Sequence, residues 1–299
     1  MRNLFFAAAF LTAAVLPAAE KFSFVRPLKA GSCFRCFVQT RQSVRYKFSI
    51  PGRDDPKVKL DTVQADFAGW LQIRQVNAVG NPSSVRIRIE RLAGAVNGKT
   101  VRNIFPAGTW LDADFFPPES KYTVNGKPVP HEIHVLLHTL FPPPESLLSD
   151  LTGASRVLPD PGQGWRPDLT PFLNLLKQRR IQLAPSAFRS GITYFGPERI
   201  GKFRCRKFGL LIETARPSGF DCRIKLTFWM SQSGPPVRMI REAREVIRQV
   251  LRGDQPFAYG TVVDLHSEDH TEQTLFPVDR IPQSTPESKS AGAWDSLIR

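Results

Sequence analysis

Three of the five histidines lie in one short segment, with a spacing suited to binding a transition metal. His131, His134 and His138 occupy positions i, i+3 and i+7, which fall within an arc of about 60° on an α-helix. Imidazoles one turn apart, such as those of His134 and His138, can chelate Zn²⁺, Cu²⁺ or Ni²⁺. The sequence therefore predicts a candidate metal site on a helix over 130–141. The alternative is a metal-free, solvated face of an amphipathic helix.

A second group of side chains with binding chemistry lies in the segment 236–252, which is rich in arginine. If this segment is a helix, its apolar residues form one arc that faces the core. A basic ridge then lies beside that arc, formed by Arg241, Arg244, Arg248 and Arg252. Such a ridge could bind an anionic lipid or polysaccharide. Glu242 and Glu245 partly neutralise it, so an ordinary solvated face is the alternative.

The four cysteines are interpreted as disulfide partners, and strand geometry restricts their pairing. Cys205 and Cys222 would lie ~23 Å apart along a predicted hairpin, far beyond the ~7 Å limit between Cα atoms. Cys33 and Cys36 would point to opposite faces of one strand, so they could bond only across a bend. We therefore expect Cys36 to pair with Cys222 and Cys33 with Cys205. The alternatives are a redox C-x-x-C motif and a four-cysteine zinc site.

Sequence signatures of catalysis are absent. The chain has no G-x-S-x-G motif and no phosphate-binding loop. In the segment His131-Glu132-Ile133-His134 the second histidine falls one position too early for the H-E-x-x-H motif of metalloproteases. We therefore expect a non-catalytic binding or structural protein. The alternative is a hydrolase whose active-site residues are dispersed in the sequence.

The elements that must position these residues are mostly strands, because apolar and polar residues alternate along much of the chain. Residues 34–38, 46–50 and 85–90 show this period of two. The turn dipeptides Asn97-Gly98 and Asn125-Gly126 are typical of tight hairpins. The pattern predicts a β-rich α+β fold of antiparallel sheets, arranged as hairpins, a half-barrel or a sandwich, with two or three short helices.

Two longer hairpins and three helices complete this interpretation. One hairpin should join 202–214 to 220–230, and another should join 257–265 to 271–277. Helices are expected over 130–141, 171–179 and 236–252, the last ended by Gly253.

Composition along the chain indicates two lobes. A segment rich in Pro and Gly, 142–167, is typical of a linker or long loop. It separates a predicted N-terminal lobe, 20–141, from a predicted C-terminal lobe, 168–279. The tail over 280–299 is rich in Pro, Ser and Lys, and we expect it to be disordered.

The first nineteen residues have the form of a secretory signal peptide. Arg2 supplies the positive charge, 4–16 is uncharged and apolar, and Pro17-Ala18-Ala19 ends the segment with small residues. We therefore expect export to the periplasm or the extracellular space, with no transmembrane segment in the mature chain.

The formal net charge of +14 bears on the choice of partner. Outside the cytoplasm this charge favours an anionic component of the cell envelope over nucleic acid, and an apolar ligand is the other partner considered. The alternative is that the charge serves solubility alone.

Overall fold

The computed structural model describes most of the chain from Lys21 to Pro282. The described residues are 21–24, 28–78, 80–102, 105–116, 119–142, 147–153, 155–215, 219–232, 235–250 and 261–282. The predicted signal peptide, Arg252 and the tail from residue 283 lie outside them.

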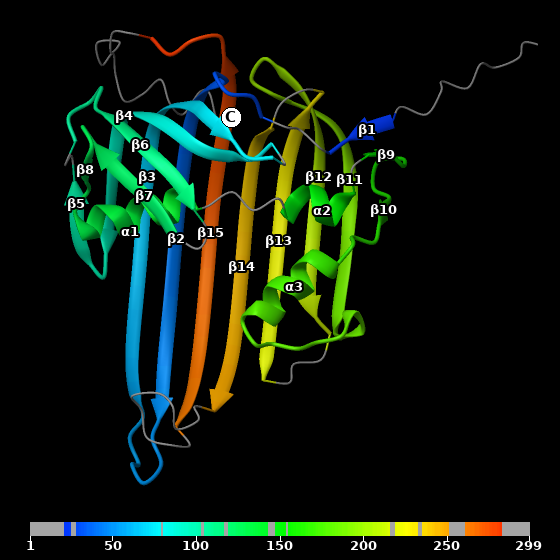
Figure 1. The fold of residues 1–299 in the computed structure, drawn as a ribbon. Coiled ribbons are helices and arrows are strands. Elements are labelled where there is room, and N and C mark those ends of the chain that lie inside the picture. The colour runs from blue at the N-terminus through cyan, green and yellow to red at the C-terminus, as the bar shows by residue number, and fades with distance from the viewer. Residues whose placement is uncertain are drawn as a thin grey trace, which may run out of the picture.

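Thirteen strands form one open antiparallel sheet, which confirms the predicted β-rich α+β fold (Figure 1). The strands follow one another in the order β10-β11-β12-β13-β14-β15-β2-β3-β4-β6-β7-β8, and β5 pairs with β4. The bounds are β2 (Cys33–Ser49), β3 (Lys57–Val76), β4 (Pro82–Val96), β5 (Lys99–Arg102), β6 (Trp110–Phe116), β7 (Glu119–Val124), β8 (Lys127–Pro128), β10 (Gly164–Trp165), β11 (Phe188–Ile200), β12 (Phe203–Thr214), β13 (Phe220–Ser231), β14 (Pro236–Val250) and β15 (Val262–Val278). A separate two-stranded sheet pairs β1 (Lys21–Ser23) with β9 (Ser155–Val157).

Local sequence explains several of these elements. Asn97 and Gly98 both have positive φ, 50° and 76°, and they join β4 to β5. Asn125 and Gly126, at 50° and 74°, join β7 to β8 in the same way. Only glycine and a few polar residues adopt these angles readily, so both predicted hairpin turns are confirmed. The predicted pairing of 202–214 with 220–230 is also confirmed, as β12 and β13.

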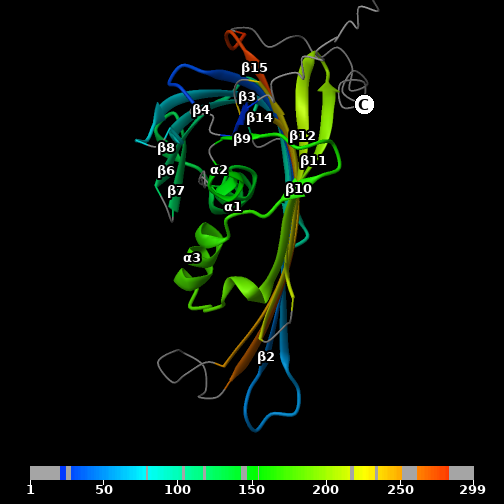
Figure 2. The ribbon, with the colours of Figure 1, turned by 90° about the vertical axis from the view of Figure 1, so that its right-hand side faces the viewer.

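The described α-helices all lie on one side of the large sheet, which we call the covered face (Figure 2). They are α1 (His131–Leu140), α2 (Leu147–Thr152) and α3 (Thr170–Gln178). The predicted helices at 130–141 and 171–179 are therefore confirmed. The carboxylate of Asp168 accepts a hydrogen bond from the backbone N–H of Thr170 at 2.9 Å, which satisfies a donor at the start of α3. No helix among the described residues is long and apolar enough to cross a lipid bilayer.

The covered face carries two hydrophobic cores. The first lies under α1, where Leu136 and Leu137 pack against the inward side chains of β2, β3 and β4. A Cβ on Gly94 would lie 2.9 Å from the Leu136 side chain, so the missing side chain allows this close approach. The second core lies under α2 and α3 and centres on Phe208, with Phe172 of α3 in the same cluster.

The two ends of the chain join the two cores. β15, the last strand, pairs along its whole length with β2, near the start of the chain. β1 places Phe22 in the second core together with Phe24, whereas the next strand, β2, contributes to the first. The segment predicted as a linker, 142–167, contains α2, β9 and β10. The two-lobe division stays a prediction.

Two sequence-based assignments are wrong. The segment predicted as a helix over 236–252 is the strand β14 over its described part, and it pairs with β13 on one side and β15 on the other. The hairpin predicted between 257–265 and 271–277 is a single strand over Val262–Val278, because β15 continues straight through to pair with β2.

Candidate functional site

A hollow lies in the middle of the sheet on the side opposite the described helices, which we call the open face. Its volume is about 620 Å³, and outward side chains of four adjacent strands, β2, β15, β14 and β13, line it. The backbone register arranges these side chains in two rows. The first row is Arg41, His270, Glu242 and Lys225, and the second is Ser43, Glu268, Arg244 and Arg223.

The alternation of each strand places these residues on the open face. In β2, Val38 and Thr40 are buried on the covered face, so Arg41 and Ser43 point the other way. In β13, Cys222 and Phe220 are buried, and Arg223 and Lys225 point outward. The alternation that buries one set of side chains in the two cores therefore places four basic side chains together on the open face. They are Arg41, Arg223, Lys225 and Arg244.

The positive charges of the hollow are only partly balanced. Lys225 Nζ lies 3.1 Å from Glu242 Oε2, and Arg223 Nε lies 3.8 Å from Glu213 Oε2. Among the described residues, Arg41 and Arg244 have no ion-pair partner within 4.0 Å. Four basic and three acidic side chains line the hollow, so a small excess of positive charge remains.

Arg223 and Arg244 are directly opposite each other in the register of β13 and β14. Like charges at such a position repel and destabilise the strand pair. An anion between the two guanidinium groups would remove this repulsion and accept hydrogen bonds from both.

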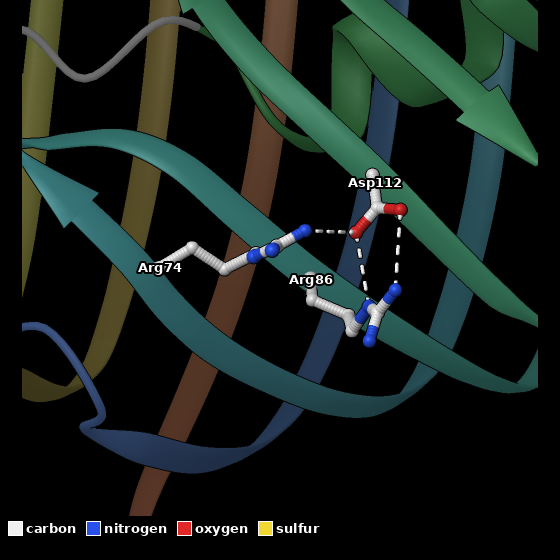
Figure 3. Close-up of polar contacts among 3 residues, drawn as sticks. All are labelled: Arg74, Arg86 and Asp112. Atoms are coloured by element: carbon white, nitrogen blue, oxygen red, sulfur yellow. Dashed lines mark hydrogen bonds and ion pairs between the residues drawn. The ribbon is translucent and has the colours of Figure 1, made fainter. Parts of the chain in front are cut away.

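Another pair of arginines on the sheet has closer acidic contacts. Arg74 of β3 and Arg86 of β4 converge on one carboxylate, that of Asp112 in β6 (Figure 3). Arg86 contacts both carboxylate oxygens, with Nε to Oδ1 at 3.0 Å and Nη2 to Oδ2 at 3.5 Å. Arg74 Nη1 lies 3.3 Å from Oδ1. Here one carboxylate lies between both arginines, whereas in the hollow Glu213 contacts Arg223 at 3.8 Å and Arg244 has no such partner among the described residues.

The basic ridge predicted on a helix over 236–252 does not form, because the strand divides its members. Arg244 and Arg248 point to the open face, where Arg244 lines the hollow and Arg248 Nε lies 3.4 Å from Asp264 Oδ1. Arg241 has the opposite parity and lies on the covered face. Arg252 lies outside the described residues. Anion binding by arginines of this segment stays a prediction.

On the covered face Arg241 belongs to a polar chain that separates the two cores. Arg241 Nη1 lies 3.1 Å from Asp269 Oδ2, and the hydroxyl of Thr271 donates to Asp269 Oδ1 at 3.2 Å. The hydroxyls of Thr271 and Thr40 are 2.9 Å apart. Because the single hydroxyl proton of Thr271 is used toward Asp269, Thr40 is the donor in that contact. These polar contacts link β14, β15 and β2 at this level of the sheet.

The predicted histidine stripe is on α1 as expected, but it does not point uniformly into solvent. His131 is exposed, whereas His134 and His138 are half-buried and stack with ring centroids 6.1 Å apart. His134 Nε2 lies 3.0 Å from the carbonyl oxygen of Ser120, and its ring packs edge-on against Tyr122. Burial, and then the neighbouring His134, lower the pKa of His138.

The structure does not bring together a set of metal ligands around these histidines. Among the described residues, no group of three or more His, Cys, Asp or Glu side chains is arranged to hold a metal ion. His266 and His270, the other two histidines, lie on β15 and point to the open face, away from α1. A metal site at His131, His134 and His138 stays a prediction.

The predicted disulfides are wrong, since all four cysteines are free and buried. From Cys222 the register runs across β14 and β15 to Val44 of β2, about 27 Å along that strand from Cys36. Cys33 and Cys205 lie on β2 and β12, strands with three others between them. Burial raises the pKa of Cys36, and it raises the pKa of both Cys205 and Cys222 to about 11. All three are therefore unreactive thiols at neutral pH.

Among the residues of the hollow, sequence reasoning named only Arg244 as a candidate binding residue, with Glu242 as a neighbour that partly neutralises its charge. The alternation of Arg223 and Lys225 with buried residues was a usable signal for the open face, and Arg41 follows the same rule in β2. The strand order that places β13, β14, β15 and β2 side by side could not be read from the sequence. Segments about 180 residues apart in the chain meet here, and no local pattern encodes that pairing.

Comparisons with known proteins add little to this picture. No protein-family model and no curated protein sequence matches the chain. Solved structures give weak likenesses. A structure described as showing lipid–protein interactions in lipovitellin has a TM-score of 0.30 at 7% identity over 88% of this chain, which spans only 27% of that chain.

Two bacterial structures are also weakly similar. A Bacteroides fragilis protein described as exported, with a YmcC-like fold, has a TM-score of 0.22 at 12% identity, over 87% of this chain and 99% of its own. A DUF1329 family protein from Desulfovibrio piger has a TM-score of 0.15 at 9% identity, over 87% of this chain and 91% of its own. Likenesses at this level establish neither the family nor the function of this chain.

Proposed function

We propose that this protein is an exported, non-catalytic binding protein that uses the hollow of its open face to hold an anionic group of an envelope polysaccharide. The observation that carries the proposal is the facing pair Arg223 and Arg244 in a hollow lined by four basic and three acidic side chains, of which Asp269 pairs with Arg241 on the covered face. Export rests on the signal-peptide character of residues 1–19.

The chemistry of the hollow favours binding. Guanidinium groups donate hydrogen bonds in a fixed, planar arrangement that matches a carboxylate or phosphate, and they stay charged at any physiological pH. Because the basic side chains are exposed, we expect moderate affinity that weakens steeply with salt.

The proposal can be tested with trigalacturonate, a short saccharide that carries carboxylates. Isothermal titration of the full chain at about 0.05 M and about 0.3 M NaCl should give binding that is much weaker at the higher salt concentration. The double substitution Arg223→Gln, Arg244→Gln should weaken binding at low salt by at least about tenfold, because it removes two charge-assisted hydrogen-bond donors.

The matched control is Arg199→Gln, Arg204→Gln. These two arginines are also exposed and directly opposite each other, but they lie at the far end of β11 and β12. This control removes the same charge from the protein and should change the affinity by less than about twofold. Equal losses in the two double variants would mean that net charge, and not the hollow, causes binding. That result would contradict the proposal.

A further inference from the structure

The sheet has an end that no helix covers. The hairpin of β2 and β3 extends well past α1 and α3, together with the neighbouring ends of β14 and β15 (Figures 1 and 2). We call this part the distal end, and it comprises residues 45–60, 248–250 and 262–265. Residues 57–60 of β3 are all exposed, so this part of the strand is solvated on both faces.

Large apolar side chains are exposed at the distal end. Val58 and Leu60 of β3 keep 52% and 58% of their surface exposed, and Val250 of β14 keeps 58%. On the other face of the same hairpin, Tyr46 and Phe48 stack in parallel with ring centroids 6.2 Å apart and are only half-buried. Apolar surface on both sides of one narrow hairpin is unusual in a strand that faces only water.

Basic side chains alternate with these apolar ones. The register places Leu60 opposite Arg45 and Val58 opposite Lys47. Residues 45–60 carry five basic and two acidic side chains, and both acidic ones, Asp54 and Asp55, are in the turn. Among the described residues, Arg45, Lys47 and Lys57 have no ion-pair partner within 4.0 Å, whereas Lys59 pairs with Asp61 at 2.8 Å.

The backbone limits how deeply this end could enter a membrane. The pairing of β3 with β4 begins at Val63, and Thr62 is hydrogen-bonded to Asn97, so within the described residues the part of β3 before Thr62 pairs only with β2. An unpaired strand edge cannot enter the hydrocarbon interior, because its N–H and C=O groups would lose their hydrogen bonds to water. The same edge is tolerated in the hydrated headgroup region.

We propose that the distal end binds the surface of an anionic lipid bilayer. Val58, Leu60 and the rings of Tyr46 and Phe48 enter the boundary between headgroups and acyl chains, while the neighbouring lysines and arginines contact lipid phosphates. Long basic side chains and aromatic rings suit this depth, where apolar and charged groups of the lipid lie close together. This surface is separate from the hollow, so the inference goes beyond the proposed binding function.

A second copy of the chain is a poorer occupant. Pairing through the β3 edge would bring Lys57 and Lys59 of two molecules together, and lysines on an edge strand oppose such pairing. Lipid phosphates, by contrast, are complementary in charge to the same side chains.

Vesicle sedimentation with the full chain tests this inference. The protein should bind vesicles of equal parts phosphatidylglycerol and phosphatidylcholine and should not bind phosphatidylcholine alone. Val58→Ser, Leu60→Ser should reduce partitioning onto the anionic vesicles by at least about tenfold, because two apolar side chains no longer leave water. Both positions are exposed, so the variant keeps its fold, and circular dichroism verifies this.

The matched control is Val157→Ser, Phe195→Ser, which removes two apolar side chains that are each 52% exposed, elsewhere on the molecule. This variant should bind the vesicles like the unmodified protein. Arg223→Gln, Arg244→Gln should lose trigalacturonate binding and keep vesicle binding, which separates the two sites.

Two results would overturn the inference. One is vesicle binding that is unchanged in Val58→Ser, Leu60→Ser. The other is self-association in analytical ultracentrifugation that the same two substitutions abolish, which would assign the distal end to contacts between copies of the chain.

Discussion

The two faces of the large sheet use the same strands for different purposes. On the covered face, side chains such as Phe208 and Ile87 are fully buried under helices and make two dense cores. On the open face, the alternate residues of the same strands are mostly charged, and they meet across strands as ion pairs or as repelling pairs.

This difference separates stability from binding within one structural element. Because successive side chains of a strand point to opposite faces, one face can carry the apolar side chains that pack in the cores while the other carries charged side chains. Substitutions on the covered face should therefore change the free energy of unfolding, and substitutions on the open face should change binding with little effect on unfolding.

The largest effect is expected for Phe208→Ala. Phe208 is fully buried in the second core, where its ring lies 5.1 to 5.5 Å from those of Phe22, Phe24, Tyr194 and Phe228. Removing a phenyl ring from such a site costs about 3–5 kcal/mol of stability, through lost transfer free energy and the cavity that remains. Urea unfolding followed by circular dichroism measures the change.

The control for Phe208→Ala lies on the other face of the sheet, on the neighbouring strand β11. Phe195 of β11 places its ring over Gly209 of β12, where a Cβ would be 2.8 Å from it, yet the side chain is 52% exposed. Phe195→Ala should cost less than about 1 kcal/mol. Similar losses for the two variants would show that the faces do not differ as described.

Much of the fold could be predicted because it follows from local rules. The alternation of apolar and polar residues predicted strands in both halves of the chain. The Asn97-Gly98 and Asn125-Gly126 dipeptides predicted two hairpin turns. The failure at β14 has a physical cause. Its sequence contains good helix formers with apolar residues about one turn apart, but hydrogen bonds to two neighbouring strands override that preference.

The candidate site was harder to predict than the fold. Arg244 was singled out for the wrong reason, as part of a helix, and its neighbour Arg223 lies across a strand pair that only the register defines. The disulfide prediction failed in the same way, because the parity of Cys36 and Cys222 was correct but their strands are not adjacent. Side-chain direction is a local property, whereas strand order is set by the whole chain.

A smaller effect is expected from pH at the edge of the first core. Burial and the neighbouring His134 lower the pKa of His138, so the unfolded chain binds a proton more readily than the folded one. Stability is therefore complete above the ordinary histidine pKa of about 6.5 and decreases as the pH falls below it toward the lowered value. Urea unfolding at a series of pH values should show this loss.

Substitution isolates the contribution of His138 from other titrating groups. His138→Leu should remove part of the loss below about pH 6.5, because the side chain can no longer take up a proton. His131→Gln, at an exposed position on the same helix, should leave the pH profile unchanged. A profile of His138→Leu that matches the unmodified protein would show that protonation of His138 does not affect stability.

The smallest effect is expected on the open face and concerns the facing arginines. If Arg223 and Arg244 repel each other, a double-mutant cycle with Arg223→Gln and Arg244→Gln should give an unfavourable coupling of about 0.2–1 kcal/mol between them. Added NaCl should reduce this coupling, since salt screens exposed charges. Trigalacturonate should stabilise the unmodified protein more than the double variant, because only the former binds it well in the folded state. A coupling that is zero or favourable at low salt would mean that Glu213 and Glu268 already neutralise the pair. The hollow would then carry no unbalanced positive charge that an anion could neutralise. The open face would differ from the covered face only in its exposure to solvent.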